Sequence, residues 1–376
     1  MQDFYLRNQT FTGQQVEVQL TFAGTLFHVS ATICMFVGTT LYPFIGFRAL
    51  LSIGIFLTMI GLISAGFATE VWHLYLSISI CTGCGLAFQT VVGLLLIPGW
   101  FSKYISTANG IYHSVFFFAN IILPFLMVRV NNTMGPRWSF FIIGIVAFVS
   151  SIAVFPFIKE RDSTDRKNKL DEVKKNGIVD WSLFRNMNLV IWFTIGPIQM
   201  VAEYITFVFA PLYSTYIGLS DIHGATIISI LSSFGFLGTV SGGILADKFG
   251  SINILIISMV IASISAMLVW MFAYTFSTMI IYAILGGLVN TMYYTVASPI
   301  TLYIAGPEKY PAALGLKMVP FLFTLAGPTI ASYLDISNRQ EPFLYVKIFC
   351  GAAYMISGLL LLVLKLRMQK KLFAKI

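Results

Sequence analysis

A few polar side chains lie inside long apolar stretches of this chain, where each one needs a specific reason to be present. Glu203 lies in the middle of such a stretch, near Gln199, on a predicted helix that Pro197 interrupts. A charged group inside a bilayer costs at least about 2.5–3.5 kcal/mol, so Glu203 is a candidate for proton coupling or solute contact. The alternative is a structural hydrogen bond to a neighbouring helix.

Four more polar residues fall within apolar stretches and allow two interpretations each. Lys317 could meet an anionic substrate, or its long stem could let the ammonium group reach the membrane surface. Asn290, Gln89 and Asn120 could bind a solute, or could form hydrogen bonds between helices. These four residues, with Glu203 and Gln199, make up the predicted substrate-binding and coupling set.

The sequence shows none of the motifs that common soluble enzymes use. It contains no GxxxxGK[ST], HExxH or GxSxG pattern, and no Cys/His cluster has the spacing of a metal site. The four cysteines all lie in apolar stretches, where we interpret them as small packing residues. We therefore predict no enzymatic activity, no catalytic residue, no metal and no cofactor.

The amino-acid composition indicates that membrane-spanning segments position these residues. Of 376 residues, 57% are hydrophobic and only 10% are charged, and the mean hydropathy is +0.85. This excludes a soluble globular domain, and continuous apolar runs are not the alternating pattern of a transmembrane barrel. The net charge of +8 comes from cations in loops, which is a membrane-orientation pattern and not a nucleic-acid-binding one.

Eleven apolar stretches have about the length that a bilayer requires, which predicts an all-α integral membrane protein in two halves of five and six spans. The stretches are 19–41, 49–69, 72–98, 107–128, 137–158, 188–212, 224–246, 252–273, 277–304, 311–333 and 343–366.

One polar segment, 159–187, separates the two predicted bundles, 19–158 and 188–366. It carries eight cations and six acids and ends in a short stretch, 180–184, that could form an interfacial helix. If this linker and the tail 367–376 share one side of the membrane, that side has 17 cations and the other has 4. The positive-inside rule then places linker and tail in the cytosol and the segment 1–18 outside. The sequons at Asn8 and Asn131 also fall outside, as candidate glycosylation sites.

An internal repeat links two loops that are 204 residues apart. Residues 38–46 and 242–250 both have Gly, Leu and Gly at relative positions 0, 3 and 8. The second copy, Gly-Gly-Ile-Leu-Ala-Asp-Lys-Phe-Gly, resembles the signature loop of the major facilitator superfamily. That resemblance implies cytosolic gating loops. Their candidate residues are Arg48, Lys103, Asp247, Lys248 and Gly250.

Five further fragments, in order along the chain, resemble the monocarboxylate transporter family, most closely its fungal members. They begin at Gly83, Trp100, Gly135, Gly306 and Ala326. The family has twelve helices, and the first span of this chain matches the second of the family. The resemblance therefore implies that the first helix is missing, through a start at Met1 that is not native or through truncation.

The resemblance also exposes a departure that bears on coupling. Proton-coupled family members carry an Asp and an Arg, four residues apart, at the positions of Gly235 and Thr239. Neither residue here can carry charge, which makes proton–lactate exchange of the animal type doubtful.

These observations predict a secondary active transporter for a small organic solute, a monocarboxylate or a related compound. We expect alternating access, a proton as candidate co-substrate (symport) and location in the plasma membrane, with the vacuolar membrane as the alternative. The partners would be the solute and lipid, and not nucleic acid. Two other hypotheses stay open: a transporter-like protein that no longer transports, acting as a sensor or a degenerate copy, and a channel.

Overall fold

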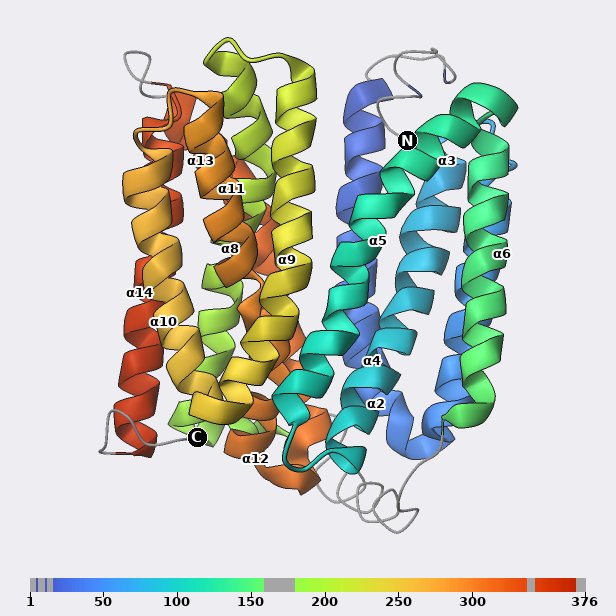
Figure 1. Cartoon of the computed structure of the whole chain (residues 1–376). Coiled ribbons are helices and arrows are strands. Elements are labelled where there is room, and N and C mark those ends of the chain that lie inside the picture. The colour runs from blue at the N-terminus through green and yellow to red at the C-terminus, as the bar shows by residue number, and fades with distance from the viewer. Residues whose placement is uncertain (1–4, 6–10, 12–15, 159–179, 337–341, 370–376) are drawn as a thin grey trace. The chain divides into compact units, whose positions relative to one another are not determined.

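The computed structural model describes residues 5, 11, 16–158, 180–336 and 342–369, and every regular element in these ranges is a helix (Figure 1). Nine helical stretches within them are long and apolar enough to cross a membrane. Two of the nine, Val18–Ala65 and Phe276–Asp335, each cover two predicted spans. The all-α membrane fold is therefore confirmed, whereas the count of eleven spans remains a prediction.

Short 3-10 or π-helical segments, labelled η, continue or connect the α-helices. The helices in the first half of the chain are α2 (Val16–Ala65), α3 (Val71–Leu74), η1 (Tyr75–Thr82), α4 (Gly83–Trp100), α5 (Ile105–Met134), α6 (Pro136–Val154) and η2 (Phe155–Phe157). Those of the second half are η3 (Trp181–Arg185), α8 (Met187–Tyr216), α9 (Asp221–Phe249), α10 (Ser251–Ile264), η4 (Ser265–Trp270), α11 (Phe276–Asn290), α12 (Met292–Met318), η5 (Val319–Leu325), α13 (Ala326–Ile336) and α14 (Leu344–Met368).

The last glycine of each repeated loop makes the turn between two helices. Gly46 interrupts α2 with φ 80°, and α2 doubles back there (Figure 1). Gly250 joins α9 to α10 with φ 95°. Residues with a Cβ rarely adopt such positive φ values, so the turn itself explains why both copies of the repeat end in glycine.

The chain forms two compact units, each with helices from both halves of the sequence. Unit 1 comprises Met1–Trp100, Ile122–Asp180 and Leu314–Val319. Unit 2 comprises Phe101–Ile121, Trp181–Ala313 and Pro320–Ile376. Helix α5 thus contributes its first part to unit 2, and the end of α12 belongs to unit 1. The predicted domain limits at 19–158 and 188–366 do not anticipate these two exchanged segments and remain a prediction.

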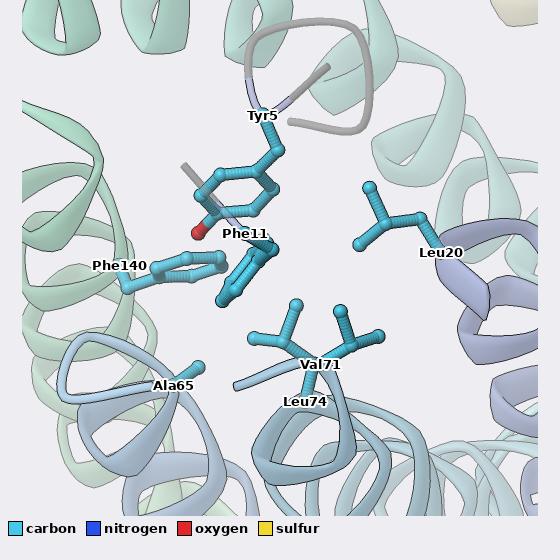
Figure 2. Packing of buried hydrophobic residues seen from close by; sticks show 7 residues of the cluster. All are labelled: Tyr5, Phe11, Leu20, Ala65, Val71, Leu74 and Phe140. Atoms are coloured by element: carbon cyan, nitrogen blue, oxygen red, sulfur yellow. The ribbon is translucent and has the colours of Figure 1, made fainter. Parts of the chain in front are cut away.

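In unit 1, an apolar cluster includes two residues from the segment that precedes α2 (Figure 2). The rings of Tyr5 and Phe11 lie 4.9 Å apart, and both side chains are buried. Figure 2 shows the Phe11 ring close to Phe140 of α6 and to Val71 and Leu74 of α3. These contacts tie part of the segment predicted to lie outside the membrane to the helix ends of unit 1.

Two other predicted features lie partly beyond the described residues. The linker is described only from Asp180, which is buried, and the short helix expected at 180–184 corresponds to η3. Asn8 falls outside the described residues. Asn131 is buried on α5, and its Oδ1 accepts a 2.6 Å hydrogen bond from Ser139. A glycan on its Nδ2 would require this buried side chain to become exposed.

Candidate functional site

Glu203 lies in the interior of unit 2, on the helix that carries two prolines. Asn186 caps the start of that helix, α8, by accepting a hydrogen bond from the backbone N–H of Asn188 at 3.1 Å. Only 4% of Glu203 is exposed. The Tyr294 hydroxyl of α12 interacts with its carboxyl group and donates a hydrogen bond to the Met200 sulfur at 3.4 Å.

Tyrosines surround this carboxyl group. Tyr204, Tyr293 and Tyr354, from α8, α12 and α14, all interact electrostatically with Glu203. Among the residues that the structure describes, no lysine or arginine forms an ion pair with it. Among the described residues, the side chains that interact with this group are therefore tyrosines and not cations.

Gln199 and Asn290 complete the polar cluster. The Gln199 side chain donates from Nε2 to the backbone oxygen of Asn290 at 3.0 Å, which joins α8 to the end of α11. Both side chains are buried. The regular helix is interrupted directly after Asn290, at Thr291, before α12 begins at Met292.

Three acceptor atoms in this cluster have no hydrogen-bond partner. They are Oε2 of Glu203, Oε1 of Gln199 and Oδ1 of Asn290, and each is shielded from solvent. Leaving a buried acceptor unsatisfied costs about 1–3 kcal/mol. We call Gln199, Glu203 and Asn290 the acceptor cluster.

Nearby, the ring of Phe117 fills the space next to Gly235, the position at which the resemblance implies an aspartate in proton-coupled relatives. A Cβ atom at Gly235 would lie 2.8 Å from Cδ1 of Phe117, and Phe117 is only 2% exposed. The hydroxyl of Thr239 is bonded to its own helix, donating towards the Gly235 oxygen (3.0 Å) and the Phe236 oxygen (2.9 Å). The space beside Gly235 is thus occupied by an aromatic ring.

The second copy of the repeated loop contacts the beginning of α5 within unit 2. Oδ2 of Asp247 accepts hydrogen bonds from the backbone N–H of Thr107 (2.8 Å) and from its hydroxyl (2.6 Å). Oδ1 accepts from the backbone N–H of Ser106 at 3.1 Å. The first N–H groups of a helix have no partner within it and carry partial positive charge, so a carboxylate is well placed there.

Glycines allow this approach of α5 to α9. A Cβ at Gly243 would lie 2.6 Å from the backbone oxygen of Ser106, and one at Gly110 would lie 2.5 Å from that of Thr239. The two helices therefore pack backbone against backbone, which small residues permit.

The remaining predicted residues lie elsewhere. Lys317 is buried in the part of α12 that belongs to unit 1. Gln89, also in unit 1, donates to the backbone oxygen of Gly54 (3.2 Å) and to the hydroxyl of Thr58 (2.9 Å). These are hydrogen bonds between helices, the alternative to solute binding given above. Asn120 is exposed on α5. The structure thus brings together three of the six candidates.

The other loop residues are on the surface. Arg48, Lys103 and Lys248 are exposed, and the Lys103 ammonium lies 5.3 Å from the centre of the Tyr104 ring. Of the loop candidates, Asp247 makes the specific polar contacts and Gly250 makes the turn.

Three residues that shape this region were missed at the sequence level. Tyr294 was not predicted to contact Glu203, because that contact depends on how α8 packs against α12. Thr107 had a readable signal, a hydroxyl residue at the start of a helix. Phe117 had none, because its neighbour Gly235 is far along the chain.

Comparison with known proteins adds independent information. The family model described as Major Facilitator Superfamily matches residues 9–278. "Probable transporter MCH2" of Saccharomyces cerevisiae is 24% identical over 93% of this chain and 74% of its own length. "Monocarboxylate transporter 2" of Mus musculus is 27% identical over 85% of this chain and 70% of its own length. "Uncharacterized transporter ESBP6" of Saccharomyces cerevisiae is 24% identical over 96% of this chain. The matched region covers only 55% of that relative's own length.

Solved structures show the same fold. The FucP transporter in its outward conformation has a TM-score of 0.71 at 13% identity, covering 96% of this chain and 94% of its own. The proton:xylose symporter XylE has a TM-score of 0.72 at 16% identity, covering 96% of this chain and 88% of its own.

Proposed function

This chain belongs to the Major Facilitator Superfamily, and on that premise we propose that it is a secondary active transporter that moves a small organic solute by alternating access. It is a multi-pass membrane protein. The names of its relatives make a monocarboxylate or a related compound the first solute class to test. We further propose that a cation is co-transported, and the proton is the ion named for the xylose symporter.

The observation that carries the proposal is the buried carboxyl group of Glu203. A charged carboxylate inside a bundle needs a compensating charge, because moving it out of water is costly. No lysine or arginine among the described residues supplies one. A bound cation would supply it. Binding and release of that cation at Glu203 would couple its gradient to the solute.

The contact of Asp247 with α5 supports a gate. Its three hydrogen bonds hold the first turn of α5 against the end of α9. Alternating access requires helices to separate at one membrane side and close at the other. We propose that these bonds form in one state and break in the other.

The orientation follows from charge. The excess of cations in the linker and tail supports a cytosolic location for both, and the plasma membrane is the location we propose. The gate formed by Asp247 would then face the cytosol.

The test is uptake by the full chain, reconstituted into sealed liposomes. Labelled lactate, pyruvate, acetate, aromatic amino acids and ring-bearing vitamins would be offered with and without an inward pH or Na⁺ gradient. We expect saturable uptake of at least one compound, increased by one of the gradients. If none is taken up by protein that is correctly inserted and folded, the transport proposal is wrong for these classes.

A further inference from the structure

Cys34 of α2 and Cys84 of α4 lie next to each other in unit 1, and the proposed transport uses neither of them. Their two thiol groups interact directly. Both side chains are only partly buried, whereas Cys350 of unit 2 is fully buried. The fold thus brings together two sulfur atoms that can join covalently and that a small, uncharged oxidant can reach.

The packing of α2 against α4 supports this pairing independently of the thiols. Ser30, Cys34 and Gly38 follow one another at intervals of four positions along α2, so they share one face of the helix. A Cβ atom at Gly83 would lie 2.5 Å from Oγ of Ser30, and one at Gly38 would lie 3.0 Å from Cδ1 of Phe88. Because these two contacts lie on either side of Cys34 along α2, its side chain faces the first turns of α4.

Cys84 lies in that part of α4. It directly follows Gly83, and Phe88 lies one helical turn further on. The Ser30 hydroxyl adds a second link, because it donates to the backbone oxygen of Ser79 in η1, which leads into α4. The glycine lets the two backbones come close together. A close approach is what a disulfide needs, since its two Cα atoms are about 4.4–6.8 Å apart.

We propose that Cys34 and Cys84 form a redox modification site, at which hydrogen peroxide converts the two thiols into a disulfide between α2 and α4. One sulfur attacks the peroxide, becomes a sulfenic acid and releases one water molecule. The other sulfur then attacks the sulfenic sulfur, and the S–O bond breaks to release a second water molecule. The thiols together lose two electrons and two protons, and the peroxide takes up both.

The disulfide would close a long loop of chain, 34–84, which includes the turn at Gly46. Closing a long loop restricts the unfolded chain, so oxidation should raise the melting temperature of the protein. This effect concerns unit 1 alone and does not depend on the transport proposed above.

The test is to map the disulfides of the purified full chain in detergent. The reduced protein is treated with hydrogen peroxide, the remaining thiols are blocked with iodoacetamide in denaturant, and the unreduced digest is analysed by mass spectrometry. We expect one linked pair of peptides, which joins Cys34 to Cys84 and disappears on reduction with dithiothreitol. Cys81 and Cys350 should carry the blocking group.

Cys81→Ala is the matched control, because it removes a third partly buried thiol only three positions before Cys84. This variant should form the link and gain thermal stability on oxidation as the wild type does, whereas Cys84→Ala should do neither. If folded wild-type protein keeps Cys34 and Cys84 unlinked after peroxide treatment, or links Cys34 mainly to Cys81, the inference is wrong. The wild-type map decides this by itself, even if a variant fails to fold.

Discussion

Thr107 presents two donors to one oxygen of Asp247, its backbone N–H at 2.8 Å and its hydroxyl at 2.6 Å. The two residues lie on α5 and at the end of α9, 140 positions apart. This contact fixes the start of α5 on unit 2.

Neutralising the carboxylate should loosen this contact. Hydrogen bonds to a charged group contribute about 1.5–3 kcal/mol, and Asp247→Asn keeps the shape but loses the charge. We expect the start of α5 to be exposed about tenfold more often, since 1.4 kcal/mol corresponds to a factor of ten. A water-soluble maleimide would report this through Ser106→Cys in a chain without its native cysteines.

The control for that experiment is Lys248→Gln, which changes an exposed neighbouring charge. Its labelling rate should match that of the parent. Equal labelling rates for Asp247→Asn and the parent would show that this contact does not act as a gate.

Close packing of α5 on α9 should depend on glycine at position 243. A methyl group there would lie 2.6 Å from the oxygen of Ser106, which is backbone and cannot move alone. We expect Gly243→Ala to lower the free energy of unfolding by about 1–3 kcal/mol, as overpacking does. Thermal unfolding in detergent measures it.

Gly99→Ala is the matched control, because a Cβ at that position meets nothing within 4 Å. If both variants melt at the same temperature, the tight approach of the two helices is not a determinant of stability.

An aspartate at position 235 should destabilise the chain because of Phe117. Gly235→Asp places its Cβ 2.8 Å from the Phe117 ring, so we expect a loss of about 1–3 kcal/mol of stability. The double variant Gly235→Asp with Phe117→Ala should recover part of this loss. Additive losses in the double-mutant cycle would mean that the two positions are not coupled.

The N-terminal cluster should contribute to the stability of unit 1. Phe11 is 7% exposed among Tyr5, Val71, Leu74 and Phe140 (Figure 2). Phe11→Ala should cost about 3 kcal/mol, in the range of other buried Phe→Ala changes. Phe157→Ala, at a side chain that is 82% exposed, is the comparison. Equal melting temperatures would show that this segment does not contribute.

The sequence alone predicted the fold class because apolar stretches of bilayer length are a direct physical signal. It also placed Gln199 and Glu203 near each other on one helix, since they are only four positions apart. It could not predict that Asn290 joins them, because that depends on how α8 packs against α11. The partition of α5 and α12 between the two units was missed for the same reason.

The repeated loop predicted more about the backbone than its short length suggests. Both Gly46 and Gly250 adopt positive φ, so the pattern reports a backbone requirement. The sequence shows that Gly235 and Thr239 carry no charge, but not that Phe117 occupies the space beside Gly235, since no pattern links residues so far apart.

We propose that the charge of Glu203 couples a cation gradient to solute movement. The most direct measurement compares accumulation of a labelled solute from the uptake panel by liposomes carrying wild type, Glu203→Gln or Glu308→Gln, under an inward cation gradient. We predict that Glu203→Gln loses gradient-driven accumulation but retains exchange of internal for external solute, while Glu308→Gln behaves as the wild type. Full accumulation by folded Glu203→Gln would contradict the account.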